Sequence, residues 1–320
     1  MPLSVENASK AAEQIFDEIE RAVVGKHELL VQMMAAILAE GHILLEDFPG
    51  LAKTLIAKSY ASALGLTFKR VQFTPDLLPG DITGSIIFDR TKNEFRLEKG
   101  PIFTNVLLAD EINRASPKTQ AALLEAMQEY QVTLGGETMP LPRPFLVIAT
   151  QNPIEYEGTF PLPEAQLDRF LIKSAVGYPT EEEEREILQR RRARKQDAFQ
   201  INQVAEAETL SDIRGLVEEV YVDSDIERYI VAVVQQTRRD QRTAVGASPR
   251  GSLALLKLAR AHAVLQGRDF VLPDDVKRFV LPALSHRLIL QPDLWMKKSA
   301  VKDILDSILT QVPVPVVAEE

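Results

Sequence analysis

The chain of 320 residues contains no cysteine, which excludes disulfide bonds, thiolate nucleophiles and zinc sites built on cysteine. No apolar run approaches the ~20 residues that a membrane-spanning helix needs. The N-terminus lacks a basic start followed by an apolar core, so we expect no secretory signal. The 46 Asp and Glu residues outnumber the 37 Lys and Arg residues, and the resulting net charge of −9 argues against nucleic-acid binding by general electrostatics. These absences predict a soluble cytoplasmic protein without a membrane span.

The composition is that of a globular protein with room for two domains, since 45% of the residues are hydrophobic and 26% are charged. Strand and helix patterns alternate as far as Gly177, which is typical of a parallel sheet covered by helices. After Pro179 only helical patterns follow. We therefore expect an α/β domain over residues 1–178, an all-helical domain over 179–312 and a mobile tail over 313–320.

The strands are predicted over residues 42–45, 67–73, 105–109 and 144–150, with a last strand after Arg169. Two β-hairpins interrupt this pattern, one at about 84–98 and one at 131–141, and each is too short to be a domain. Two helices surround a turn at residues 24–26. In the second domain a capping box of Thr180 and Glu183 begins a helix over 181–195. Further helices are predicted over 211–220, 224–239, 248–265, 273–286 and 297–311.

The stretch HILLEDFPGLAKT, residues 42–54, organises the first domain. An apolar strand runs into a loop and then into Lys53 and Thr54 at the start of a helix, which is the layout of a cradle for nucleotide phosphates. Lys53 would reach the β and γ oxygens, and the Thr54 hydroxyl would bind Mg²⁺. The segment predicted to bind the nucleotide is Pro49, Gly50, Leu51, Ala52, Lys53, Thr54 and Leu55. The alternative is a βα turn that merely ends in Lys-Thr.

The loop departs from the pattern G-x-x-x-x-G-K-[ST] at both glycines, because Asp47 and Ala52 stand in their places. If Ala52 adopts a left-handed backbone, the strain costs roughly 1–3 kcal/mol relative to glycine. A domain of this size tolerates that cost. The departure therefore bears on the rate of hydrolysis more than on nucleotide binding.

Two carboxylates and an amide follow the ends of other predicted strands. Asp110 and Glu111 end the buried strand at 105–109, and Asn152 follows the strand at 144–150. Carboxyl ends of parallel strands share one edge, where ligands of such folds collect. We expect Asp110 to hold Mg²⁺ and Glu111 to polarise the attacking water, while Asn152 bonds the γ-phosphate or that water. The alternatives are a solvated pair of acids and a turn-forming asparagine.

One arginine breaks a local rule. Ser248 caps a predicted helix and Pro249 is its first residue, so Arg250 places a cation in the first turn, where the helix dipole disfavours it. This violation suggests that Arg250 meets an anion, although exposure would also make it cheap. A second arginine, Arg169, ends a short helix before the last strand.

These residues together resemble the MoxR family of AAA+ ATPases, and the resemblance runs through nearly the whole chain. The motifs that carry it are Val24-Gly25-Lys26, Pro49 to Thr54, Leu108 to Arg114, Ala149 to Pro153, Leu167 to Phe170 and Ser248 to Arg250. The resemblance implies that Val24 and Gly25 lie beside the adenine. It also implies that Asn152 is the first sensor, Arg250 the second sensor and Arg169 an arginine finger for the neighbouring subunit. Arg114 would be a further arginine that bridges subunits.

By the same resemblance the protein is an ATP-hydrolysing homo-oligomeric ring, expected to have six subunits, with ATP and Mg²⁺ between the α/β domain and a helical lid. Such rings act as chaperones on a protein client, often with a partner that carries a von Willebrand factor A domain. The two hairpins would project toward the central pore. One alternative is a nucleic-acid motor, but residues 89–93 mix charges and 135–137 carry no Lys or Arg. Another alternative is a nucleotide-gated binding module that hydrolyses little.

Overall fold

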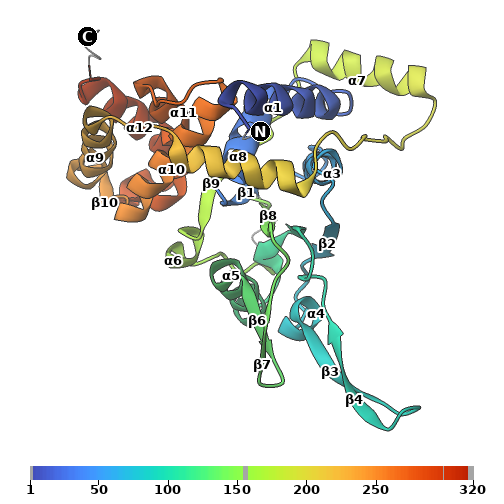
Figure 1. Cartoon of the computed structure of the whole chain (residues 1–320). Helices are drawn as coiled ribbons and strands as arrows, with labels where there is room; N and C mark the ends of the chain where they lie inside the picture. The colour runs from blue at the N-terminus through green and yellow to red at the C-terminus, as the bar shows by residue number, and fades with distance from the viewer. Residues whose placement is uncertain (1–2, 154–157, 298, 316–320) are drawn as a thin grey trace.

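The computed structural model describes residues 3–153, 158–297 and 299–315. Of the predicted mobile tail, residues 316–320 lie outside the described part. Within that part, no helix combines the length and the apolar character required to cross a membrane. The chain forms an α/β unit around a parallel sheet, followed by a helical lid, so the predicted fold class is confirmed (Figure 1).

A five-stranded parallel sheet in the order β2-β5-β8-β1-β9 forms the centre of the α/β unit. Its strands are β1 (His42–Glu46), β2 (Phe68–Gln72), β5 (Val106–Asp110), β8 (Leu146–Gln151) and β9 (Phe170–Ser174). Alternate residues of the central strands enter two separate cores. Leu107 and Val147 face one core, while Leu108 and Ile148 face the other. Burial on both faces explains why these strands read as nearly continuous apolar runs.

One face of the sheet is covered by α1 (Val5–Glu20), α2 (His27–Leu38) and α3 (Lys53–Ala63), and the lid joins the same core. Helix α1 starts at Ser4, whose side chain accepts a hydrogen bond from the Asn7 N–H, and it buries Ala8, Ile15 and Ile19 along one side. Helix α5 (Pro117–Glu129) covers the opposite face, with the bases of the hairpins beside it. The phosphate loop, defined here as residues 47–54, joins β1 to α3.

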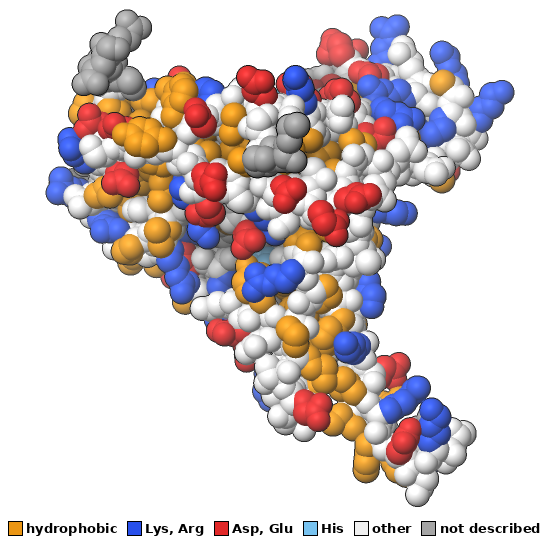
Figure 2. All heavy atoms as spheres, in the orientation of Figure 1, with side chains coloured by type: hydrophobic (Ala, Val, Ile, Leu, Met, Phe, Trp, Pro, Cys, Tyr) orange, Lys and Arg blue, Asp and Glu red, His pale blue; other side chains and the backbone are white. Residues whose placement is uncertain are grey.

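The two predicted hairpins are present and extend from the sheet in the same direction (Figure 1). The first pairs β3 (Gly84–Asp89) with β4 (Glu94–Lys99) after a short helix α4 (Pro79–Thr83), and the second pairs β6 (Gln131–Leu134) with β7 (Glu137–Pro140). The hairpins touch, because a Cβ added at Gly135 would lie 2.0 Å from Ile86 Cδ1. Phe88 and Phe95 of the first hairpin are exposed and their rings lie 5.1 Å apart. Figure 2 shows hydrophobic side chains along this extension.

The lid consists mainly of α8 (Ala207–Glu219), α9 (Ser224–Arg239), α10 (Pro249–Leu265), α11 (Pro273–Leu284) and α12 (Ala300–Gln311). It also contains a short antiparallel pair, β10 (Thr243–Val245) with β11 (Ile289–Leu290), where the sequence predicted helices alone. Strands of two and three residues are too short to show an alternating pattern, so they could not be found from periodicity. Helix α8 begins four residues before its predicted start.

Helix α7 (Glu181–Arg194) connects the two units along the chain and lies at the outer edge of the molecule beside α1 (Figure 1), and it buries none of its residues. Thr180 and Glu183 form the predicted capping box. Its basic end is solvated over most of its surface, and Figure 2 shows Lys and Arg side chains gathered there. Arg190 is the exception, because its guanidinium donates to the Glu20 and Arg21 carbonyls at the end of α1. That contact complements the negative end of the α1 dipole and attaches α7 to the body.

His42, at the start of β1, gives the fold a pH dependence. The ring is buried, Nδ1 accepts from the Val147 N–H at 3.0 Å, and Nε2 therefore donates to the Met127 carbonyl at 2.9 Å. Burial lowers the pKa of His42 from 6.5 to about 4. Between pH 6.5 and 4, His42 is protonated in the unfolded chain but stays neutral in the folded chain. The folded state therefore loses stability as the pH falls from 6.5 toward 4.

We expect protonation of His42 in the unfolded chain to lower the free energy of unfolding by roughly 2 kcal/mol between pH 6.5 and 5. The measurement is the urea midpoint at several pH values for the wild type and for His42→Gln, whose amide can still donate and accept but does not titrate. The variant should be less stable than the wild type at pH 7.5, and its free energy of unfolding should fall less as the pH is lowered. Equal pH slopes for the two proteins would contradict the assignment.

Candidate functional site

The phosphate loop leaves β1 and enters α3 through two left-handed residues. Gly50 has φ +82°, and Ala52 has φ 58° and ψ 14°. Ala52 therefore adopts the left-handed backbone that is strained for alanine relative to glycine. A Cβ at Gly50 would meet no atom within 4 Å, which leaves the backbone open to a ligand. Lys53 is the first residue of α3, so the free N–H groups at the helix start line the same concavity.

Asp47, at the position of the first glycine of the pattern, has a structural role that the sequence did not reveal. Its buried carboxylate accepts from the Gly177 N–H at 2.6 Å and from the Phe48 N–H at 2.8 Å. Asp47 therefore fixes the loop to the chain segment that leaves the α/β unit. Only the tertiary fold brings Gly177 to this loop, since the two residues are 130 positions apart.

The Lys53 side chain is positioned by a hydrogen bond within the phosphate loop. Its ammonium donates to the Asp47 carbonyl at 2.5 Å, and its side chain is half-buried. Burial lowers the pKa of Lys53, and the carboxylates of Asp47, Asp110 and Glu111 partly oppose that shift. A phosphate oxygen would offer this ammonium a stronger partner than a carbonyl does.

Asp110 ends β5 beside the loop, and two neighbours orient it. The Thr150 hydroxyl donates to Oδ1 at 2.6 Å, and Arg70 donates to Oδ2 from Nη2 at 2.6 Å and from Nε at 3.0 Å. Arg70 comes from the edge strand β2 and was not among the predicted site residues. Its guanidinium neutralises the carboxylate that is expected to hold Mg²⁺.

Glu111 follows in a left-handed conformation with φ 56°, which turns the chain out of β5. Its N–H donates to the Thr150 hydroxyl at 2.8 Å. Its carboxylate accepts from Gln72 at 2.8 Å and from Arg114 at 2.9 Å. Gln72 and Arg70 are alternate residues of β2, so they present side chains on the same face and reach the two acids together.

The loop and the strand ends enclose one cavity of about 250 Å³, called the loop cavity here. Its walls are Pro49, Gly50, Leu51, Ala52, Lys53, Thr54, Arg70, Asp110, Glu111 and Asn152. Asn152 is buried, and its carbonyl lies 3.4 Å from the Asn113 amide. The structure thus gathers the predicted cation, hydroxyl, acids and amide around a single space.

The donor set of the loop cavity fits Mg²⁺ that arrives with a nucleotide. Among the described residues no group of three or more His, Cys, Asp or Glu side chains could hold a metal by itself. Thr54 and Asp110 supply one hydroxyl and one carboxylate, and phosphate and water oxygens would complete the shell that Mg²⁺ prefers. These residues therefore suit a metal that is shared with a substrate phosphate.

Val24 and Gly25 lie at the turn between α1 and α2. Val24 is buried, and a Cβ on Gly25 would meet the Glu183 carboxyl group at 1.9–2.0 Å. The neighbouring Lys26 donates to the Tyr178 carbonyl at 3.1 Å and lies 3.9 Å from Glu183. The turn therefore contacts the segment that begins α7, while its predicted place beside the adenine stays a prediction.

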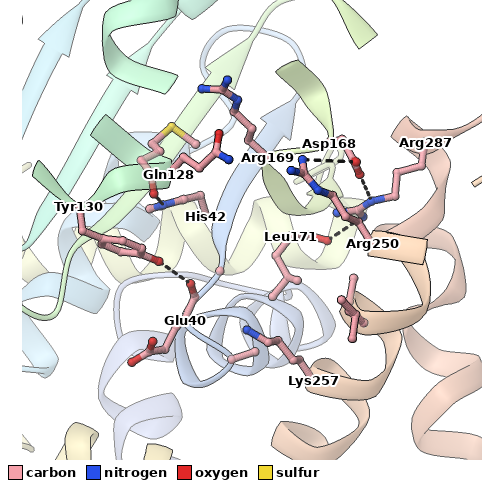
Figure 3. Close-up of a pocket in the computed structure, with 15 residues that line it drawn as sticks. Glu40, His42, Gln128, Tyr130, Asp168, Arg169, Leu171, Arg250, Lys257 and Arg287 are labelled. Atoms are coloured by element: carbon pink, nitrogen blue, oxygen red, sulfur yellow. Dashed lines mark hydrogen bonds and ion pairs between the residues drawn. The ribbon is translucent and has the colours of Figure 1, made fainter. Parts of the chain in front are cut away.

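Arg169 and Arg250 lie at a second cavity, of about 290 Å³, which we call the arginine cavity (Figure 3). Residues that line it include Gly41, His42, Arg169, Leu171, Arg250 and Lys257. Gly41 and His42 mark the amino end of β1, whereas the phosphate loop leaves its carboxyl end. The five residues of β1 separate the two ends by roughly 16 Å. The structure thus brings Arg250 to Arg169 and not to its own phosphate loop.

The reason for this placement lies in how the lid is attached. Arg287, just after α11, donates to Asp168 at 2.6 Å and to the Phe170 carbonyl at 2.8 Å. His286 also contacts the Phe170 carbonyl, at 3.0 Å. These contacts join the lid to the start of β9, so the first turn of α10 reaches Asp168 instead of the phosphate loop.

Comparison with known proteins gives a consistent result. Residues 42–172 match the family described as "ATPase family associated with various cellular activities (AAA)", and residues 235–308 match the AAA lid domain. The chain is 47% identical to the uncharacterized protein YeaC of Bacillus subtilis, over 94% of this chain and 93% of that one. It is 45% identical to the chaperone MoxR1 of Mycobacterium tuberculosis, over 95% and 82%. It is 30% identical to the protein MoxR of Methylorubrum extorquens, over 95% of both chains.

A solved structure supports the same relationship. The chain superposes on the crystal structure of a protein from Cytophaga hutchinsonii, assigned as an ATPase, with a TM-score of 0.90 and 40% sequence identity. The match covers 97% of this chain and 96% of the other. Fold and sequence therefore agree over both the α/β unit and the lid.

The left-handed backbone of Ala52 leads to a test of the loop. Ala52→Gly should relieve strain of about 1 kcal/mol but loosen the loop, so nucleotide affinity should stay within about tenfold of the wild type. Affinity can be measured by titration calorimetry and the ATPase rate by phosphate release. Ala52→Val is the matched control, because a β-branched residue is poorly tolerated at this φ and should weaken binding much more. A rise of several orders of magnitude in the rate of Ala52→Gly would show that alanine holds turnover down.

Proposed function

This chain belongs to the MoxR family of AAA+ ATPases, and we propose that it hydrolyses ATP as a ring of identical subunits to remodel a protein client. One observation carries the proposal: the groups needed for hydrolysis are divided between two cavities at opposite ends of β1. The loop cavity holds Lys53, Asp110 and Glu111, and the arginine cavity holds Arg169 and Arg250. A complete site therefore needs a second subunit.

In the loop cavity each side chain has a separate task. The backbone N–H groups of the loop and the Lys53 ammonium bind the β- and γ-phosphates, and Thr54 with Asp110 holds the metal. When bound, Mg²⁺ would neutralise charge on the phosphates. Glu111, fixed by Gln72 and Arg114, orients and polarises the attacking water, and Asn152 holds the γ-phosphate or that water. Val24 and Gly25 would border the adenine.

Arg169 and Arg250 would both act on the nucleotide of the neighbouring subunit. Their cavity is exposed and cationic, and it lies too far from the subunit's own phosphate loop to supply charge there. Positive charge on the developing γ-phosphate is a large term in phosphoryl transfer, so assembly would switch hydrolysis on. A closed ring satisfies this head-to-tail contact at every site, and we expect six subunits.

The client role is supported by the hairpins and by one relative. Phe88 and Phe95 expose apolar rings on the first hairpin, whose strands β3 and β4 lie at the end of the molecule away from the lid (Figure 1), and a protein segment could bind them there. MoxR1, 45% identical, is named a chaperone. A partner with a von Willebrand factor A domain would fit this role. A nucleic-acid motor is less favoured, because acidic residues are interspersed with the Lys and Arg residues of the first hairpin, residues 84–99, and residues 135–137 of the second carry no Lys or Arg. The third alternative, a binding module that hydrolyses little, is less favoured because Asp110, Glu111 and Asn152 line the same cavity as Lys53.

The chemistry of the loop cavity can be tested with two variants. Lys53→Ala should abolish tight ATP binding, because the cation on the phosphates is lost. Glu111→Gln should keep binding and lose hydrolysis by orders of magnitude, because the metal site and the bond to Gln72 remain while the base is removed. Binding is measured by calorimetry and hydrolysis by phosphate release. Equal loss of binding in both variants would contradict the assigned roles.

Subunit mixing tests the division of the site. Arg169→Ala and Arg250→Ala should each bind ATP normally and hydrolyse it slowly. For Arg169→Ala the rate of hydrolysis should fall by roughly 10³-fold. Either variant, co-assembled with Lys53→Ala, should regain part of the ATPase, because one protein supplies the loop and the other the arginines. Wild-type specific activity should rise with protein concentration.

The decisive mixture pairs Arg169→Ala with Arg250→Ala. If both arginines act on the neighbour, no interface in the mixed ring carries both, and activity stays low. If Arg250 serves its own nucleotide, an Arg169→Ala loop beside an Arg250→Ala finger is complete, and activity returns. Recovery of activity in this mixture would show that Arg250 acts on the nucleotide of its own subunit. Wild-type specific activity that does not depend on protein concentration would argue against the ring.

A further inference from the structure

Asp168, which directly precedes Arg169, joins the α/β unit to the lid. Its carboxylate accepts from Arg287 Nε at 2.6 Å and from the Ser248 hydroxyl at 3.4 Å, and it lies 3.7 Å from Arg250 Nη1. Figure 3 shows this carboxylate between the two lid arginines. One acid of the α/β unit therefore contacts three separate groups of the lid.

Arg287 makes this contact rigid. Its side chain is only 4% exposed, and besides Asp168 it donates to the carbonyls of Phe170, Leu171 and Ala283. Burial lowers the pKa of Arg287, and Asp168 opposes that shift. A buried guanidinium without its carboxylate would be strongly unfavourable, so the lid and the start of β9 are fixed to each other at this point.

The same carboxylate reaches Arg250 through the start of α10. Ser248 caps this helix by accepting from the Arg250 N–H at 3.2 Å, and its hydroxyl contacts Asp168. Arg250 and Arg287 repel each other, and Asp168 lies between them, so Arg250 stays near Asp168 despite that repulsion. The guanidinium of Arg169 makes no ion pair or hydrogen bond to another described residue. In Figure 3 it extends away from Asp168.

We propose that Asp168 is a positioning residue, which holds Arg169 and Arg250 as one unit at a fixed angle to the lid. The proposal rests on the proposed function, in which both arginines act on a neighbour's nucleotide. Asp168 touches no nucleotide itself. It sets the backbone direction of Arg169 through Arg287 and the place of Arg250 through charge and the Ser248 cap. Because a misplacement of about 1 Å can cost 10²-fold in rate, the position of this pair governs turnover.

The first measurement is the kinetics of Asp168→Asn, which keeps the size of the side chain and removes its charge. We expect kcat to fall by about 10–100-fold while the KM for ATP stays within about twofold, because the variant's own phosphate loop is unchanged. Asp168→Glu restores the charge one methylene further out and should recover part of the loss. If both variants keep the wild-type kcat, the proposal is wrong.

Mixed rings separate positioning from a general loss of structure. Asp168→Asn co-assembled with Lys53→Ala should regain activity, because the Asp168→Asn subunit has a sound loop and its partner has sound arginines. Asp168→Asn with Arg169→Ala should not, because neither supplies a positioned pair. A folding defect would give no recovery in either mixture, and that result would overturn the proposal. If Arg169→Ala with Lys53→Ala also fails to recover, the shared site itself is wrong and not the role of Asp168.

A matched control comes from another buried acid of the lid. Asp275 is 1% exposed and is bound by Arg268 at 2.7 Å and His262 at 2.5 Å, within the lid and away from the arginine cavity. Asp275→Asn should lower the Tm at least as much as Asp168→Asn but leave kcat within about twofold. If Asp275→Asn reduces kcat as strongly as Asp168→Asn does, the effect of Asp168 is on stability and the proposal fails. Should Asp168→Asn not fold, Asp168→Glu carries the same comparison of kcat with KM and the same mixtures.

Discussion

Strand β1 imposes the constraint on which the rest of the structure depends. It is a central strand, paired with β8 on one side and β9 on the other, so neither of its ends can move independently of the sheet. The phosphate loop leaves its carboxyl end, and the arginine cavity opens at its amino end. No side chain spans the roughly 16 Å between them. Arg169 and Arg250 therefore lie away from the phosphate loop of their own chain, and under the proposed function hydrolysis requires an assembly.

The loop cavity is already arranged for charge. Lys53 donates to a carbonyl, Arg70 neutralises Asp110, and Gln72 with Arg114 holds Glu111, so these four contacts stand where phosphates and metal would bind. Exchanging such contacts for contacts to a ligand changes the number of hydrogen bonds little. The net free energy is therefore set by the charge of the ligand. The resting network keeps the acids oriented, which reduces the reorganisation needed during the reaction.

Much of this site could be predicted from the sequence, because strand ends and helix starts carry strong local patterns. The loop before Lys53 and the acids after residues 105–109 were predicted from such patterns, and so was the possible strain at Ala52. Other features depend on contacts between distant segments. Arg70 and Gln72 matter only because β2 pairs with β5, and Asp47 matters only because Gly177 returns to the loop. The cap at Ser248 was predictable, but the side of the sheet to which it brings Arg250 follows from Arg287 and Asp168.

This attachment of the lid has a consequence for how a ring would work. The lid contacts the start of β9 through Arg287 and His286 and carries Arg250 on the same side as Arg169. It also shares a core with α1 and α2, whose connecting turn contacts Glu183 at the start of α7. A change at one subunit's nucleotide that moved this turn would reach the lid of that subunit. Arg250 would move with the lid, and Asp168 would couple that movement to Arg169. Under the proposed function, the state of one nucleotide site would therefore alter the arginines that are offered to the next subunit.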